Sequence, residues 1–137
     1  MIIDTSALVA MFADEPERSR FLLALSHAHS RSVSAGCWIE FGTVLVRRFG
    51  IQEPAAVQTR FAAALDIQTS PVEERQVAAA ALGYATYGRG SGHRARLNFG
   101  DCFAYALANA TGEPLLFKGD DFNHTDLLLA PESAFPR

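Results

Sequence analysis

Acidic side chains recur beside apolar segments of this 137-residue chain. Asp4 ends the apolar start "MIID", Glu40 lies inside "CWIEFGTVLV", Asp101 opens "DCFAYALA", and Asp120 and Asp121 follow "PLLFKG". A carboxylate near a hydrophobic core is costly unless a cation or a helix N-terminus compensates its charge. These acids are therefore the candidates for a functional site.

A cluster of such carboxylates would repel itself or raise some of its own pKa values. A divalent cation relieves that repulsion, and carboxylate ligands without His or Cys favour Mg²⁺ or Mn²⁺. Each acid also has a structural interpretation: Asp4 or Asp101 as a helix cap, Glu40 as a surface residue, and Asp120 or Asp121 as a turn residue. Glu40 is the most informative, because its neighbours are apolar and a lone carboxylate among them needs a partner.

The elements that would position these acids alternate along the chain. The patterns predict strands over residues 2–4, 32–35, 67–69 and 115–117, and helices over 6–12, 16–29, 38–49, 54–65, 73–87 and 103–110. Thr5 or Ser6 is expected to cap the first helix, and Gly50 and Gly112 are expected to end two others.

This order indicates one α/β domain, residues 1–137, with a mainly parallel sheet. The carboxyl ends of parallel strands converge on one crevice, which gathers Asp4 and the pair at 120–121. Glu40 and Asp101 are expected near helix starts, where backbone N–H groups favour negative charge. Four acidic positions far apart in the sequence could therefore meet.

Composition limits the class of protein. The chain is 49% hydrophobic, which suffices for one core without disulfides, and Cys37 and Cys102 are expected to be buried thiols. The start lacks the features of a signal peptide, and no apolar run reaches the roughly eighteen residues of a membrane span. A soluble, cytoplasmic protein is expected.

Charge is distributed unevenly. The net charge of −3 argues against a wholly basic nucleic-acid-binding surface. Residues 75–100 nevertheless contain no acid, and Arg89, His93, Arg94 and Arg96 make that stretch locally basic. These four residues are the first candidates for phosphate contacts, with Arg47 and Arg48 as a secondary patch and a solvated loop as the alternative.

Four motifs carry a family resemblance. The segments "MIIDTSALVA", "CWIEFGTVLVRRFG", "LNFGDCFAYALA" and "PLLFKGDDF" resemble, in order, the signatures of a PIN-domain ribonuclease of the VapC toxin type. The resemblance implies a three-layer α/β/α fold with a mainly parallel central sheet. It maps Asp4, Glu40 and Asp101 onto the acidic metal site, and Thr5 or Ser6 onto the hydroxyl position.

One motif departs from the family pattern. The family usually carries a fourth acid in a T-x-D pattern after the last strand, but here Lys118 and Gly119 stand where that pattern would run. The fourth acid is thus Asp120 or Asp121. Asp121 is favoured because burial of Phe122 would hold it steadily toward the crevice.

The resemblance implies a Mg²⁺-dependent endoribonuclease, with Mn²⁺ as another possible cofactor, that acts as the toxin of a toxin–antitoxin pair. One ion held by Asp4 and Asp101 would orient the scissile phosphate, and a second, weaker ion would lie near Glu40 and the pair at 120–121. Glu40 could instead act as a base toward the attacking water.

The implied partners are RNA, a small antitoxin that inserts a segment into a groove beside the site, and a second copy of the chain. Candidate apolar faces for these contacts carry Phe12, Phe21, Leu22 and Phe49, which could equally belong to the core.

Two other classes of function stay open. A catalytically degenerate PIN-like domain would keep only protein binding. A phosphatase of the haloacid-dehalogenase type also starts with a strand ending in Asp, but its second Asp, two positions later, is Ser6 here. Metal-dependent cleavage of RNA would separate the three.

Overall fold

A parallel four-stranded sheet forms the centre of the computed structural model, which describes residues 1–134. The strands are β1 (Ile2–Ile3), β2 (Ser32–Ser34), β3 (Gln68–Ser70) and β4 (Leu115–Leu116), in the spatial order β3-β2-β1-β4. Ile2 pairs with Ser32 on one side and with Leu115 on the other. The predicted α/β class with a parallel sheet is confirmed, and the last three residues of the predicted domain 1–137 lie outside the described ones.

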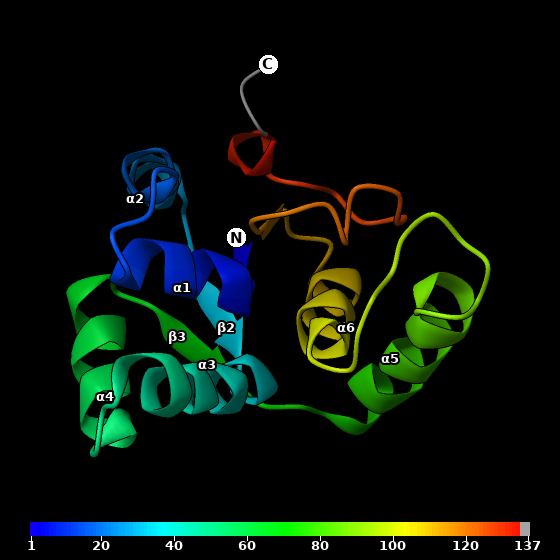
Figure 1. Ribbon diagram of the computed structural model, residues 1–137. Helices are drawn as coiled ribbons and strands as arrows, with labels where there is room; N and C mark the ends of the chain where they lie inside the picture. Colours follow the sequence, from blue (N-terminus) through cyan, green and yellow to red (C-terminus); the bar gives the residue numbers. More distant parts are fainter. Residues whose placement is uncertain (135–137) are drawn as a thin grey trace.

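Within residues 1–134, six α-helices surround the sheet: α1 (Thr5–Phe12), α2 (Arg18–His27), α3 (Ala35–Phe49), α4 (Pro54–Ala64), α5 (Glu74–Tyr87) and α6 (Asp101–Thr111). A short 3₁₀ helix, η1 (Pro131–Ser133), follows. Figure 1 shows α5 and α6 on one side of the strands and α1, α2 and α4 on the other. Helix α6 contacts β1 and β2, and α3 contacts α1, α4 and α6. Helices α3 and α6 therefore meet beside the sheet.

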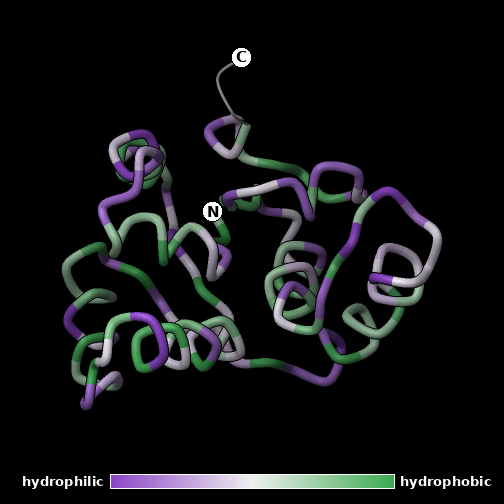
Figure 2. Tube along the Cα trace, viewed as in Figure 1, coloured by the Kyte–Doolittle hydropathy of each residue, from purple (hydrophilic) through white to green (hydrophobic). Residues whose placement is uncertain are grey.

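The core fills the space between these layers. Its largest fully buried side chains include Ile2, Leu8, Phe21, Phe41 and Phe117. Figure 2 shows the same division along the chain, with a hydrophobic segment in β1 next to the N-terminus and hydrophilic stretches in the loop between α5 and α6. Each Å² of apolar surface removed from water contributes about 25 cal/mol to the free energy of folding, so this core is the main source of stability.

The four apolar side chains considered for partner binding belong to this core. Phe21 is fully buried, and Phe12, Leu22 and Phe49 are partly buried and pack against the core cluster. Phe12 makes edge-to-face contacts with the rings of Phe41, Phe49 and Phe61. The alternative that these residues belong to the core is therefore confirmed for Phe21, and the other three pack against the core while keeping part of their surface exposed. Cys37 and Cys102 are buried free thiols, as predicted.

Helix boundaries follow local capping. Asp4 caps α1, with its carboxylate accepting from the Ser6 amide at 2.9 Å, so the predicted cap at Thr5 or Ser6 is wrong by one or two residues. Ser34 caps α3, which therefore starts at Ala35, three residues before the predicted start. Gly50 and Gly112 end α3 and α6 in the left-handed conformation, as expected.

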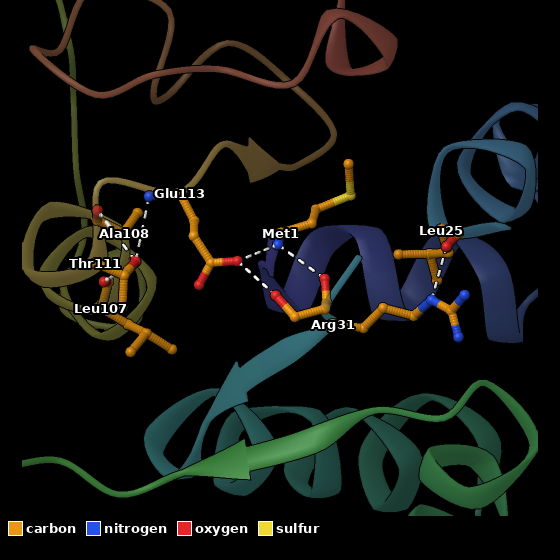
Figure 3. Close-up of polar contacts among 8 residues, drawn as sticks. Met1, Leu25, Arg31, Leu107, Ala108, Thr111 and Glu113 are labelled. Atoms are coloured by element: carbon orange, nitrogen blue, oxygen red, sulfur yellow. Dashed lines mark hydrogen bonds and ion pairs between the residues drawn. The ribbon is translucent and has the colours of Figure 1, made fainter. Parts of the chain in front are cut away.

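Hydrogen bonds join the amino end of β1 to two neighbouring loops, as Figure 3 shows. The ammonium group of Met1 donates to the carboxylate of Glu113 and to the carbonyl of Ser30, whose hydroxyl also donates to Glu113. These contacts anchor one end of the strand, so its carboxyl end, which leads into Asp4, has a defined position. Within residues 1–134, no helix has the length and apolar character needed to cross a membrane.

Candidate active site

An open pocket of about 740 Å³ lies where β1, α1, α3, α6 and the loop after β4 converge. Its acidic lining consists of Asp4, Glu40, Asp101 and Asp121, with Glu15 at a further position. The structure therefore brings four of the five predicted acids to one pocket. The remaining one, Asp120, is exposed and outside the lining.

Asp4 is buried directly after β1, and Ser6 makes two hydrogen bonds to its carboxylate. Its Oδ2 accepts from the Ser6 amide at 2.9 Å and from the Ser6 hydroxyl at 2.6 Å. Its Oδ1 is buried without a hydrogen-bond partner in the described structure. Burial, with a further contribution from the charge of Glu40, raises the pKa of Asp4 to about 6.

Ser6 also links two segments of the pocket. Its hydroxyl oxygen accepts from the Lys118 amide at 2.9 Å while donating to Asp4, so it joins the start of α1 to the loop after β4. The neighbouring Thr5 hydroxyl instead donates to the Cys37 carbonyl at 3.4 Å, away from the carboxylates. Of the two residues mapped onto the hydroxyl position, Ser6 is the one that contacts an acid.

Asp101 begins α6 and is fixed by a reciprocal pair of hydrogen bonds. The Asn98 amide donates to Asp101 Oδ2 at 2.8 Å, and the Asp101 amide donates to Asn98 Oδ1 at 2.9 Å. Burial raises the pKa of Asp101 to about 7, and the charges of Asp4, Asp121 and Glu40 add to that increase. The negative charges of all three other acids therefore make ionisation of Asp101 less favourable.

Glu40 lies in the second turn of α3, not at its start, because the helix begins at Ala35. The expectation that the N-terminal amides of α3 compensate its charge is wrong for that reason. The carboxylate instead lies against Gly100, where a Cβ would overlap it. Absence of a side chain at position 100 lets Glu40 approach the start of α6 and thus Asp101.

The two adjacent aspartates after β4 differ in placement. Asp121 lines the pocket and contributes to the raised pKa of Asp101, whereas exposed Asp120 accepts from the Asn123 side chain at 3.0 Å. Phe122 is buried against Phe117 in an edge-to-face contact. This arrangement favours Asp121 over Asp120 as the fourth acid.

The donor set fits a hydrated hard cation. Among residues 1–134, no group of three or more His, Cys, Asp or Glu side chains lies close enough together to enclose a metal. The buried, unpartnered Oδ1 of Asp4 and the mutual charge effects on Asp101 nevertheless leave negative charge uncompensated. Mg²⁺ retains several waters and binds through one or two carboxylates, so Asp4 and Asp101 suit it without a closed protein cage.

The cations of the pocket are not the ones predicted first. Arg89, His93, Arg94 and Arg96 are exposed on the loop between α5 and α6, and none of them lines the pocket. That loop pairs with itself through a bridge between Gly88 and Leu97. Arg47, Arg48 and Lys118 line the pocket instead.

Helical spacing explains why Arg47 and Arg48, the secondary patch of the sequence prediction, line the pocket. Positions 40, 43, 44, 47 and 48 recur at intervals of three and four, which puts them on one face of α3 together with Glu40. Lys118 had no comparable signal, because its placement depends on the loop after β4.

Comparisons with known proteins agree on the family and the fold of this chain. The family model described as PIN domain matches residues 1–128. VapC ribonuclease Mb0640 of Mycobacterium bovis is 47% identical over 130 residues, covering 93% of this chain and 95% of the relative. Ribonuclease VapC42 of Mycobacterium tuberculosis is 44% identical over 127 residues, covering 93% and 96%.

Solved structures agree in fold. A crystal structure of Mycobacterium tuberculosis VapC20, described as a sarcin-ricin loop cleaving toxin, matches with a TM-score of 0.73 at 17% identity, covering 98% of each chain. A toxin–antitoxin complex from Klebsiella pneumoniae matches with a TM-score of 0.67 at 16% identity, covering 95% of this chain and 96% of the other.

The chain therefore belongs to the PIN-domain family. Within that family, its curated relatives at 44% and 47% identity are VapC ribonucleases, which confirms the resemblance seen in the four motifs.

Proposed function

We propose that this chain is the toxin of a toxin–antitoxin pair, a Mg²⁺-dependent endoribonuclease that cuts RNA in the cytoplasm at the acidic pocket. The observation that carries the proposal is the buried Oδ1 of Asp4, which has no hydrogen-bond partner within residues 1–134 and lies in a pocket with three other acids. The 44–47% identity to VapC ribonucleases over more than nine-tenths of the chain supports the same reaction.

The residues of the pocket have different roles in the proposed cleavage reaction. Asp4 and Asp101 would hold the cation, while Ser6 and Asn98 keep their carboxylates in place. Bound Mg²⁺ supplies a nucleophilic water and neutralises charge that develops on the phosphate. Glu40 binds the cation or accepts a proton from the attacking water. Mn²⁺ is expected to replace Mg²⁺, since both prefer oxygen ligands.

Cleavage of single-stranded RNA by the purified chain tests this proposal. We expect products with Mg²⁺ or Mn²⁺ and none with EDTA, and no release of phosphate from p-nitrophenyl phosphate under either condition. Release of phosphate would instead indicate the phosphatase class. Absence of cleavage by the folded chain at any Mg²⁺ concentration, with binding of the antitoxin retained, would indicate a degenerate PIN-like domain.

We also propose that the antitoxin occupies an apolar groove of about 540 Å³ between α3 and α4. Trp38, Ile39, Val46 and Pro54 line the groove, and it shares Thr43 and Arg47 with the acidic pocket. A segment in this groove would therefore reach the edge of the active site. This continuity, together with the match to a toxin–antitoxin complex, makes an antitoxin the expected occupant.

Charged substitutions test the groove. Ile39→Asp with Val46→Asp should abolish binding of the antitoxin while leaving RNA cleavage intact, because both side chains are exposed and outside the acidic pocket. Leu23→Asp, at an exposed position of α2, is the matched control. Undiminished binding by the double variant would move the antitoxin to another surface.

We also propose that the chain forms a homodimer through the face that carries α5. Leu82 on α5 and Phe99, two residues before α6, are exposed by 70% and 78%. Apolar side chains this exposed favour contact with a second copy. Leu82→Glu with Phe99→Glu should give a monomer by light scattering if the wild-type chain is a dimer through this face.

A further inference from the structure

One face of α3 lines the pocket, and this face is acidic at one end and basic at the other. Glu40 lies at the acidic end, and Arg47 and Arg48 lie two turns further on. At 1.5 Å per residue, Glu40 and Arg47 are separated by roughly 10 Å along the helix axis. Between them, Thr43 and Val44 line the pocket without charge, and the Thr43 hydroxyl donates to the Glu40 carbonyl at 2.7 Å.

Two of the three pocket cations are already neutralised. Lys118 Nζ lies 2.6 Å from Glu15 Oε2 and 3.2 Å from Glu17 Oε2. Arg48 Nη1 lies 3.2 Å from the other oxygen of Glu15. These contacts lower the pKa of Glu15 and raise the pKa of Lys118, so each partner stabilises the charge of the other.

Arg47 differs from its neighbours. Its side chain is exposed at the pocket, and across the described part of the chain no carboxylate forms an ion pair with it. An arginine guanidinium presents a planar set of donors that matches the oxygens of a phosphate. An unpaired arginine beside an acidic site is therefore suited to an anion that the acids themselves would repel.

We propose that Arg47 binds a backbone phosphate next to the scissile one, so that the RNA strand runs along α3. This inference rests on the proposed ribonuclease function. A separation of roughly 10 Å along the helix axis leaves room for two successive phosphates, one at the acidic end of the row and one at Arg47. The scissile phosphate therefore lies at the carboxylates and a neighbouring phosphate lies at Arg47. The loop at 89–96 does not provide this contact, because none of its basic residues lines the pocket.

Salt-dependent RNA binding tests the assignment without cleavage. The assay uses a labelled single-stranded RNA oligonucleotide in a cleavage-inactive Asp4→Asn background, with Kd measured over a range of salt concentrations. Arg47→Ala should weaken binding about tenfold and reduce the slope of log Kd against log salt by about 0.7, the value for one phosphate on a single strand. Arg47→Lys should keep the slope but lose part of the affinity.

Arg60→Ala is the matched control, since Arg60 is exposed on α4, outside the pocket, and its replacement removes the same charge. Equal slopes for Arg47→Ala and Arg60→Ala would overturn the assignment of Arg47. With Asp4 restored, Arg47→Ala should raise KM for RNA and change kcat little, and a loss confined to kcat would also contradict a binding role.

The two proposals fail in different ways. If the wild-type chain cleaves RNA with Mg²⁺ while Arg47→Ala behaves like Arg60→Ala, only the phosphate site is wrong. If the wild-type chain neither binds nor cleaves RNA, the proposed function is wrong and the phosphate site fails with it.

Discussion

Asn98 and Asp101 hold each other through two hydrogen bonds, each from the backbone amide of one residue to the side-chain oxygen of the other, at 2.8 and 2.9 Å. The pair closes the loop that precedes α6 and sets the direction of the Asp101 carboxylate. A backbone amide at the first position of a helix has no partner within the helix, so Asn98 supplies one. The same contact therefore stabilises α6 and positions an acid of the pocket.

Asn98→Ala should affect both roles. Loss of the acceptor for the Asp101 amide should lower the free energy of unfolding by about 1 kcal/mol. Alanine keeps the backbone amide that donates to Asp101 Oδ2, so the carboxylate becomes less well oriented only through loosening of the loop, which raises the Mg²⁺ concentration needed for half-maximal cleavage. Denaturant unfolding and Mg²⁺ titration of cleavage measure the two effects, and a wild-type Mg²⁺ requirement would show that Asn98 is structural only.

Gly100→Ala should displace Glu40. The backbone at position 100 has φ −62° and ψ −39°, which alanine adopts readily, so any effect comes from overlap of the new methyl group with the Glu40 carboxylate. We expect slower cleavage in the wild-type background and little further loss when Glu40→Ala is already present. A double-mutant cycle on the cleavage rate measures this coupling, and additive losses would contradict it.

The two aspartates after β4 should respond unequally. Asp121→Asn should raise the Mg²⁺ concentration needed for cleavage, because Asp121 lines the pocket. Asp120→Asn should leave that concentration unchanged, since Asp120 is exposed and outside the lining. The second variant serves as the control for the first. Equal and negligible effects would mean that three carboxylates suffice.

Stability without metal should fall as pH rises. The folded state raises the pKa of Asp4 to about 6 and of Asp101 to about 7, from an ordinary 3.8, so it binds protons more tightly than the unfolded chain does. Their contribution to stability is fully present below about pH 4 and is lost as pH rises through about 7.

Comparison with Asp101→Asn isolates this effect from other titrating groups. In EDTA, the Tm of Asp101→Asn should rise relative to that of the wild-type chain as pH increases from about 5 to about 8. This range spans the raised pKa values of Asp4 and Asp101. Mg²⁺ should stabilise the wild-type chain at the upper end and not the variant. A difference in Tm independent of pH would contradict the raised pKa of Asp101.

Much of the architecture follows from local sequence. The periodicity of apolar residues, together with turn residues, predicts the four strands and six helices of residues 1–134. Gly50 and Gly112 end their helices as predicted. The predicted starts of α3 and α6 lie too far along the sequence. Ser34 and the Asn98–Asp101 pair extend these helices toward their N-termini. Such caps depend on single side chains, which periodicity does not detect.

The candidate site was only partly predictable. Its acids lie in motifs, so their positions could be named before their geometry was known. The basic residues at 89–96 lie shortly before Asp101 in the sequence, yet none of them lines the pocket. Lys118 enters the pocket through tertiary contacts with Glu15 and Glu17, which are more than one hundred residues away. Contacts of that separation have no local signature.

Direct measurement of metal binding tests the central claim most sharply. Electron paramagnetic resonance of Mn²⁺ titrated into the purified chain at pH 8 counts bound ions without requiring RNA cleavage, at a pH chosen about one unit above the raised pKa of Asp101 so that its carboxylate is ionised. We predict at least one bound Mn²⁺ per chain for the wild type and for Asp120→Asn, and loss of that site in Asp4→Asn and Asp101→Asn, with all four proteins folded. Equal Mn²⁺ binding by Asp4→Asn and the wild type would contradict the assignment of the acidic pocket as the metal site.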